Sequence, residues 1–157
     1  ASCLVGSEMC IRDSFVTGQL GKAKQGLNDW LNKKDSIYCK DFLRPKPQFQ
    51  KAKDISDFAT SCIDISDGLI KDLGDICKQS NVGAELCYED IPILNDHKDL
   101  THGDDYELCF TAPSHLDDQI KSKGFFLIGK IIPKLGLLVK KDGCEITFEK
   151  NGWDPFE

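Results

Sequence analysis

The sequence predicts an α+β protein in which strands and helices mix irregularly and pack in layers. Short apolar runs of strand length recur along the chain, separated by turns rich in glycine, proline and acidic residues. A helix after Gly68 has a clear apolar face, because its apolar residues are spaced at i, i+1, i+4, i+7 and i+8. These residues are Leu69, Ile70, Leu73, Ile76 and Cys77. No repeat or coiled-coil pattern is visible.

The segment before residue 61 is predicted to be mostly helical. Residues 16–21 are expected to form a strand end and a glycine-rich turn, followed by a helix at 22–32. A short helix at 37–43 ends at the RPKP segment of residues 44–47, because the two prolines prevent its continuation. Residues 54–60 are expected to form another helical turn.

The rest of the chain alternates strands and helices. The amphipathic helix ends near Gln79, and a second helix is expected at 114–123, capped by Ser114. The last two strands form a hairpin across residues 141–143. The expected strands are 61–65, 84–88, 106–111, 125–132, 136–140 and 144–148.

Residues 1–14 do not share the organisation of the rest. They have neither helical nor strand periodicity, and the segment from Cys3 to Ser14 resembles a translated adapter sequence. The alternative is an ordinary flexible terminus. We therefore expect residues 1–14 to be a non-native segment and residues 15–157 to be the native domain, with further sequence missing upstream.

The composition of the 157 residues excludes several classes of protein. Hydrophobic residues make up 40% and charged residues 29%, which suits a packed core. The net charge is −6 and no basic stripe is present, which argues against nucleic-acid binding. No apolar run is long enough for a transmembrane helix, and no secretory signal is recognisable, so we expect no membrane partner and a cytoplasmic location.

The eight cysteines do not predict a metal site. No pair has CxxC spacing and none has a closely spaced histidine, so a zinc site is disfavoured. Several lie in apolar runs, for example Cys62 and Cys109, and are expected to be buried free thiols in a reducing compartment.

The first candidate site is the segment DISDGL at residues 64–69. Asp64 leaves a strand, while Ser66 and Asp67 stand at the start of a helix. Carboxylate oxygens on a fixed turn suit Mg²⁺, and the free N–H groups of a helix start favour a phosphate. The alternative is structural: Ser66 or Asp67 caps the helix and Asp64 is solvated.

Two further candidates lie nearer the C-terminus. The segment GDDYEL at residues 103–108 brings adjacent carboxylates to the entrance of a strand, although an acidic turn would look the same. Trp153 could stack on a planar ring, although a lone tryptophan is more often a packing residue.

Other motifs give little support to a site. The RPKP segment could meet a phosphate, but it is typical of a solvated turn. His97, His102 and His115 have no ligand spacing. No P-loop lysine motif and no GxGxxG after a strand is present, and no nucleophilic triad can be named.

Taken together, the motifs of residues 15–157 resemble the C-terminal portion of thiamine-monophosphate kinase. The pair formed by DISDGL and GDDYEL is the most specific part of the resemblance. The matching segments, in order, are VTGQLG (16–21), RPKP (44–47), CIDISDGL (62–69), GDDYEL (103–108), IGK (128–130) and GWD (152–154).

The resemblance implies the fold of the aminoimidazole ribonucleotide synthetase-like superfamily. This is a layered α/β/α C-terminal domain, with a mixed sheet and flanking helices. It also implies a kinase that uses ATP to convert thiamine monophosphate to thiamine diphosphate. In such proteins ATP and Mg²⁺ bind between this domain and an N-terminal domain, which builds a homodimer. Because that domain is missing here, this chain alone is expected to be nearly inactive and compatible with a monomer.

The resemblance also implies roles for five residues. Asp64 and Asp67 would ligate Mg²⁺, and Ser66 would contact ATP. Asp104 would contact the substrate, and Trp153 would contact its thiamine moiety. No catalytic residue is implied within this chain.

One departure lies inside these motifs. The HGD of residues 102–104 stands where the family has Gly-Gly-Glu, so the carboxylate at Asp104 is shorter by a methylene. Two alternatives therefore stay open: another ATP-dependent member of the superfamily, or a non-catalytic domain that binds a nucleotide or phosphate.

Overall fold

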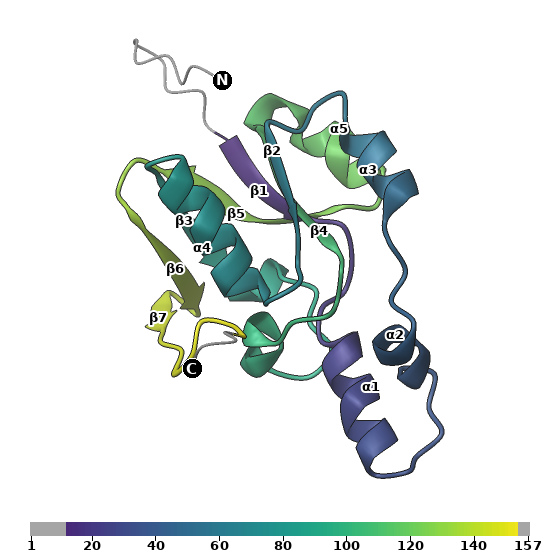
Figure 1. Cartoon of the computed structure of the whole chain (residues 1–157). Coiled ribbons are helices and arrows are strands. Elements are labelled where there is room, and N and C mark those ends of the chain that lie inside the picture. The colour runs from purple at the N-terminus through teal and green to yellow at the C-terminus, as the bar shows by residue number, and fades with distance from the viewer. Residues whose placement is uncertain (1–11, 154–157) are drawn as a thin grey trace.

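The computed structural model describes residues 12–153, which form a mixed sheet with helices on both faces (Figure 1). The strands are β1 (Arg12–Val16), β2 (Ser61–Asp64), β3 (Gly83–Cys87), β4 (Leu108–Pro113), β5 (Phe126–Ile132), β6 (Gly136–Lys141) and β7 (Cys144–Ile146). The α-helices are α1 (Lys22–Leu31), α2 (Cys39–Leu43), α3 (Phe49–Ile55), α4 (Leu69–Gln79) and α5 (Asp117–Ser122). Short 3₁₀ turns are η1 (Tyr88–Asp90), η2 (His97–Thr101) and η3 (Ser114–Leu116).

The sheet has the strand order β2-β4-β1-β5-β3-β6-β7. The β3–β6 pair is parallel and the other neighbouring pairs are antiparallel. The connection between the parallel strands runs through β4, α5 and β5, in keeping with the long crossover that a parallel pair requires. The sheet is therefore mixed, as the resemblance implied.

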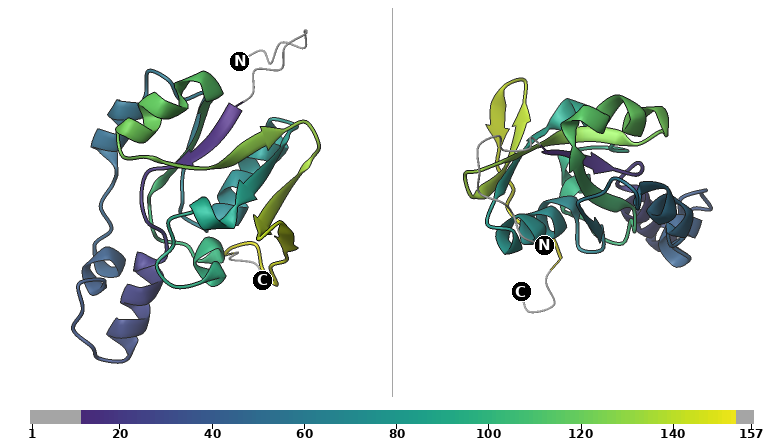
Figure 2. Two further views of the ribbon diagram at one scale, coloured as in Figure 1. Left: turned by 180° about the vertical axis from the view of Figure 1, so that it is seen from behind. Right: turned by 90° about the horizontal axis from the view of Figure 1, so that it is seen from above.

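The two faces of the sheet bury two separate apolar clusters, because neighbouring strand residues point to opposite faces. On β1, Val16 belongs to the cluster under α4, while Phe15 belongs to the cluster that includes Ile55 of α3 and Ile120 of α5. Phe15 stacks on Phe110 of β4 with a centroid separation of 5.2 Å. Helices thus flank both faces (Figure 2), which confirms the layered α+β fold.

The helix α4 forms where the apolar periodicity predicts it. Its buried positions are Leu69, Ile70, Asp72, Leu73 and Cys77. An aspartate on this otherwise apolar face is unusual, and its role becomes clear at the functional site.

Some element boundaries differ from those expected. The helical turn predicted at 54–60 is confirmed only in part: α3 spans Phe49–Ile55, and residues 56–58 continue it as a turn, in which Ala59 N donates to Ile55 O at 2.9 Å. The sequence pattern misleads because only Ile55 of this helix is buried, so no periodic apolar face marks it. The strand expected at 106–111 begins at Leu108, because Tyr106 has a positive φ of 50°.

The first strand begins three residues before the expected native start. Residues 12–14 pair with β4, and Asp13 and Ser14 also pair with β5. Asp13 and Ser14 are buried, yet Ser14 Oγ has no hydrogen-bond partner within the described residues 12–153. The non-native character of residues 1–14 stays a prediction, and residues 1–11 lie outside the described part of the chain.

The six cysteines within residues 12–153 are all free thiols. Cys77 and Cys109 are buried as expected, and burial raises the pKa of the Cys77 thiol. The expectation of burial is wrong for Cys62, which is exposed on the edge strand β2. Within the same residues, no helix is long and apolar enough to cross a bilayer.

Candidate functional site

The loop between β2 and α4, residues 65–68, is organised by the buried carboxylate of Asp72. Its Oδ2 accepts hydrogen bonds from the backbone N–H groups of Ser66, Asp67 and Gly68 at 2.9, 3.0 and 3.2 Å. Burial raises the pKa of the Asp72 carboxyl, and the negative charge of Asp67 raises it further. The hydrogen bonds from the three backbone N–H groups act in the opposite direction and lower it. A carboxylate from inside the helix therefore holds the loop that carries the first candidate motif.

This arrangement corrects two sequence-based expectations. Neither Ser66 nor Asp67 caps α4, because its N-cap position is Gly68, with φ 121° and no side-chain cap. The N–H groups expected to favour a phosphate already donate to Asp72. A phosphate at this loop would therefore need other donors.

The loop at residues 103–107 packs directly on the first loop. Asp104 N donates to Ser66 O at 2.9 Å, and Tyr106 N donates to Ile65 O at 2.9 Å. Gly103 lies so close to Ser66 O that any side chain at this position would overlap it. The exposed Asp104 has a positive φ of 68°, which turns the chain at the point where the two loops meet.

Asp105, the next acidic residue of this loop, has a structural role. Asp105 accepts hydrogen bonds from Gly21 N at 2.7 Å and Ala23 N at 3.1 Å, at the N-terminus of α1. A carboxylate is stabilised at that end of a helix by the unpaired N–H groups. Burial nevertheless raises the pKa of the Asp105 carboxyl. Of the adjacent pair, Asp104 alone stays exposed.

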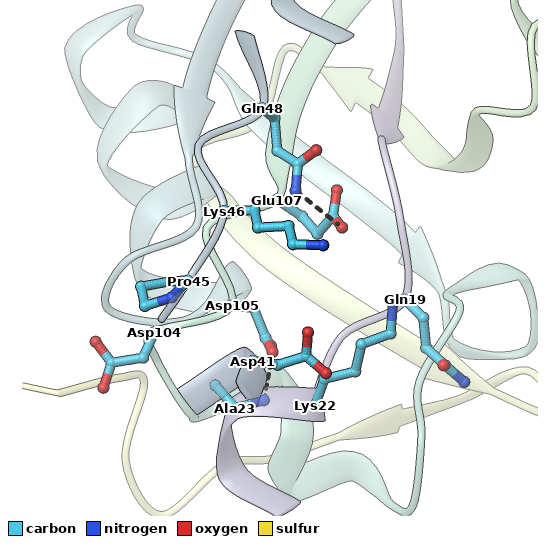
Figure 3. A pocket seen from close by; sticks show the side chains of 10 residues that line it. All are labelled: Gln19, Lys22, Ala23, Asp41, Pro45, Lys46, Gln48, Asp104, Asp105 and Glu107. Atoms are coloured by element: carbon cyan, nitrogen blue, oxygen red, sulfur yellow. Dashed lines mark hydrogen bonds between the residues drawn. The ribbon is translucent and has the colours of Figure 1, made fainter. Parts of the chain in front are cut away.

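Glu107 is buried at the base of the same loop. Its Oε2 accepts hydrogen bonds from Thr17 Oγ1 at 2.7 Å and from Lys51 Nζ at 2.7 Å. Gln48 donates to the other oxygen at 3.5 Å (Figure 3). These contacts join α3 and the β1–α1 turn to the site.

The C-terminal segment completes the arrangement. Trp153 N donates to Asp67 O at 2.9 Å. Lys71 Nζ forms a 2.6 Å ion pair with Asp67 Oδ2 and donates to Trp153 O at 2.8 Å. The indole of Trp153 is exposed.

These segments surround a pocket of about 620 Å³. Four of the five residues named from the sequence line it, namely Ser66, Asp67, Asp104 and Trp153. Asp64 does not line it and lies exposed at the end of β2. The remaining lining residues are Thr101, His102, Gly103, Tyr106, Lys150 and Gly152. His102, which has no ligand spacing in the sequence, thus lies in the pocket wall.

A second pocket of about 180 Å³ adjoins the first through Asp104 (Figure 3). Lys22, which the sequence did not single out, and Lys46 line it together with carboxylates. Lys46 belongs to the RPKP segment, which was the available signal. The other lining residues are Gln19, Ala23, Asp41, Pro45, Gln48, Asp105 and Glu107.

The carboxylates at the site bear on the Mg²⁺ that the resemblance implies. Within the described residues 12–153, no group of three or more His, Cys, Asp or Glu side chains could hold a metal ion. Mg²⁺, however, commonly keeps several waters and takes one or two protein carboxylates together with substrate phosphates. Asp64 is exposed at the end of β2, and Asp67 lies in the pocket wall paired with Lys71, so both are carboxylates of the type that such an open site uses.

Sequence reasoning placed Asp105 and Glu107 in the candidate GDDYEL segment without their structural roles, because their partners Gly21 and Thr17 are far away in the chain. It did not single out Asp72 or Lys71 as residues that organise the site. A signal existed for Asp72, an acidic residue on an apolar helix face.

Comparison with known proteins gives consistent results. No family model matches the chain. Thiamine-monophosphate kinase of Escherichia coli K12 is 36% identical over 167 aligned residues, covering 90% of this chain and 51% of that protein. The enzyme of Pyrococcus horikoshii is 31% identical and covers 88% and 48%. The chain thus spans about half the length of the curated relatives it matches.

Solved structures agree. Thiamine-monophosphate kinase from Stenotrophomonas maltophilia K279a superposes with a TM-score of 0.71 at 31% identity, over 87% of this chain and 51% of that one. AaThiL complexed with AMPPCP and TMP gives 0.78 at 28% identity, over 96% and 53%. E. coli HypE gives 0.71 at 16% identity, over 96% and 53%, and shows the fold alone. The chain therefore has the aminoimidazole ribonucleotide synthetase-like fold and is similar, over about nine-tenths of its length, to half of a thiamine-monophosphate kinase.

Proposed function

We propose that this chain supplies half of the active site of a kinase that converts thiamine monophosphate to thiamine diphosphate. In that reaction the terminal phosphoryl group of ATP passes to the phosphate of the substrate, and ADP leaves. The observation that supports this most is the convergence of Ser66, Asp67, Asp104 and Trp153 on one pocket. These residues come from three segments that are far apart in the sequence.

The proposed roles follow from the chemistry of each side chain. Phosphoryl transfer depends mainly on positioning and on neutralising charge, so the protein does little covalent work. Asp64 and Asp67 would hold Mg²⁺, which neutralises phosphate charge when bound. The hydroxyl of Ser66 would donate a hydrogen bond to ATP. Its backbone N–H is held by Asp72, which fixes the main chain of Ser66 at the pocket.

Asp104 and Trp153 would orient the substrate. Asp104 stands exposed where the two pockets meet, so its carboxylate is available as a hydrogen-bond acceptor. Trp153 presents an exposed aromatic face to a cationic ring, an attractive arrangement. The shorter side chain at Asp104 would still reach the substrate after a small movement of its loop.

The relatives support ATP and the phosphate ester as ligands, since AaThiL was solved with AMPPCP and TMP. We propose the same two ligand classes for this protein, a cytoplasmic location, and a homodimer built by the half that is absent here. No part of this function calls for nucleic acid or a membrane.

The direct test is to rebuild the longer protein and measure thiamine diphosphate. We also propose that residues 1–14 are non-native, so source DNA would be read upstream of the Ser14–Phe15 junction. The reading frame there should continue into a domain rich in aspartates. The joined protein should then form thiamine diphosphate from ATP, Mg²⁺ and thiamine monophosphate.

Variants sharpen this test. Trp153→Ala should raise the KM for thiamine monophosphate about tenfold, because it removes a substrate contact. Trp30→Phe is the matched control, since Trp30 is also exposed but lies on α1 outside both pockets. A joined protein that phosphorylates a different substrate in a panel, or that binds ATP without turnover, would refute the proposal in favour of one of the two alternatives.

A further inference from the structure

Lys71 makes a contact that the proposed function does not use. It lies in the first turn of α4, and its ammonium group bridges two partners. One is Asp67 Oδ2 at 2.6 Å, and the other is the backbone oxygen of Trp153 at 2.8 Å. A single cation therefore joins a proposed Mg²⁺ ligand to the residue proposed to contact the thiamine moiety.

The backbone supplies a second tie between the same residues. Trp153 N donates to Asp67 O at 2.9 Å. Gly152 is pressed against them as well, since a Cβ there would lie 2.7 Å from both Asp67 O and Lys71 Cβ. Both the N–H and the C=O of Trp153 are thus fastened to the Asp67–Lys71 pair. We refer to Asp67, Lys71 and Trp153 together as the clamp.

We propose that Lys71 is a positioning residue that fixes Trp153 over the pocket, and that a divalent cation at Asp67 weakens its hold. The second half of this inference rests on the magnesium site of the proposed function. The first half rests on the contacts of the clamp alone.

Lys71 and a divalent cation compete for the negative charge of Asp67. The Asp67 carboxylate carries one negative charge, and Lys71 neutralises it in the structure. The side chains are only partly buried, with exposures of 26% and 30%, so a solvated cation can reach the pair. A divalent cation on the same carboxylate repels the nearby ammonium group. Lys71 then loses part of its anchor, and so does Trp153.

The coupling must act in both directions. If cation binding loosens Lys71, then removing Lys71 must strengthen cation binding by the same free energy. Occupancy of the metal site would thereby control how freely Trp153 can adjust to the ring it contacts.

The first experiment measures the clamp without metal. Amide hydrogen exchange at Trp153 is followed by NMR in the 157-residue chain with EDTA present. Lys71→Met should speed this exchange about tenfold, because the segment is held at one place instead of two. Lys71→Arg should restore slow exchange. Lys78→Met is the matched control, since it makes the same change in the last turn of α4. Circular dichroism verifies that each variant is folded.

The second experiment adds MgCl₂ to the same samples, with NaCl of equal ionic strength as the control for screening. Exchange at Trp153 should become several-fold faster in the natural chain and should not change further in Lys71→Met. Lys71→Met should also bind Mg²⁺ several-fold more tightly in calorimetry. A Trp153 amide in the natural chain that responds to MgCl₂ no more than to NaCl overturns the coupling.

The outcomes separate this inference from the proposed function. Equal exchange at Trp153 in the natural chain and in Lys71→Met overturns the positioning role, whatever the kinase assay shows. A rebuilt protein without kinase activity removes the proposed function, yet the metal-free exchange measurement would still report on the clamp.

Discussion

At the scale of single residues, the acidic side chains divide into those that hold the backbone and those that face the pocket. Asp72 and Asp105 each accept several backbone N–H groups, and Glu107 is paired with Lys51. Asp104 remains exposed at the pocket. Sequence alone treats these carboxylates as equivalent, because burial decides the difference.

The role of Asp72 predicts a loss of stability in Asp72→Asn. All three hydrogen bonds go to one oxygen, and the amide oxygen that replaces it lacks the charge that strengthens them, so we expect a loss of about 1–3 kcal/mol. Urea unfolding measures it. Asp75→Asn, on an exposed position of the same helix, should stay within about 0.5 kcal/mol of the natural chain. Equal stability of the two variants would contradict the anchoring role.

The buried hydroxyl of Ser14 predicts the opposite effect. In the part of the chain that the structure describes, Ser14 Oγ has no hydrogen-bond partner, although the residue is fully buried in β1. Burying an unpaired hydroxyl is unfavourable, so Ser14→Ala should stabilise the chain by about 1 kcal/mol. The exposed Ser80, at the C-cap of α4, gives the control Ser80→Ala, for which we expect no comparable gain. A destabilised Ser14→Ala variant would show that the hydroxyl is satisfied after all.

A carboxyl pair between β1 and α5 predicts a pH effect. Burial, followed by the hydrogen bond and charge of Asp13, raises the pKa of Asp117 from 3.8 to about 6. The folded chain therefore binds a proton that the unfolded chain has already released. This contribution to stability is present below pH 4 and is lost as the pH rises through about 6.

Thermal unfolding between pH 4 and 7 tests this sign, with Asp117→Asn as the comparison. The natural chain should lose stability relative to Asp117→Asn as the pH increases across this interval. Parallel curves for the two proteins would contradict the raised pKa of Asp117.

At the scale of elements, the site is a stack of loops. The loop at 65–68 lies between the loop at 103–107 and the C-terminal segment, and backbone hydrogen bonds join it to both. Such contacts require close approach of main chains, which explains glycine at 103 and 152. The stack brings together residues that follow the end of β2 and residues that precede the start of β4.

Two glycines of the chain should therefore respond oppositely to substitution. Gly103→Val places a side chain against Ser66 O and should destabilise the chain by about 1–3 kcal/mol. Gly74→Ala meets open space in the middle of α4 and should stabilise it by about 0.5–1 kcal/mol. Chemical denaturation compares them directly, and a tolerated Gly103→Val would mean that the two loops can separate.

At the scale of the whole molecule, two apolar clusters on opposite faces of the sheet support folding of the chain. Several large apolar side chains near α1, α2 and α3 are exposed in this half-length chain: Trp30, Leu31, Ile37, Leu43 and Phe49.

We therefore predict that the 157-residue chain folds but is nearly inactive. Incubated with ATP, Mg²⁺ and thiamine monophosphate, it should give no thiamine diphosphate above background, because half of a metal-dependent site cannot hold the triphosphate in line. Circular dichroism provides the control for folding. Robust product formation by the folded chain would show that its two pockets suffice.

The sequence by itself determined the α+β class, the amphipathic α4 and the segments that carry the site. Apolar periodicity and turn residues are local signals, and short motifs survive as local patterns. It also indicated Ser66, Asp67, Asp104 and Trp153 as a group, through their resemblance to a known family.

Only the tertiary structure decided how those residues are held. The N–H groups that the sequence offered to a phosphate are occupied by Asp72, and Asp105 serves α1 instead of a ligand. The clamp at Lys71 and the start of β1 at Arg12 were likewise invisible to local patterns. The physical reason is the same for Asp72, Asp105, Lys71 and the start of β1: hydrogen bonding and burial depend on partners that the fold brings together. No local pattern encodes which partner a carboxylate or an ammonium group will meet.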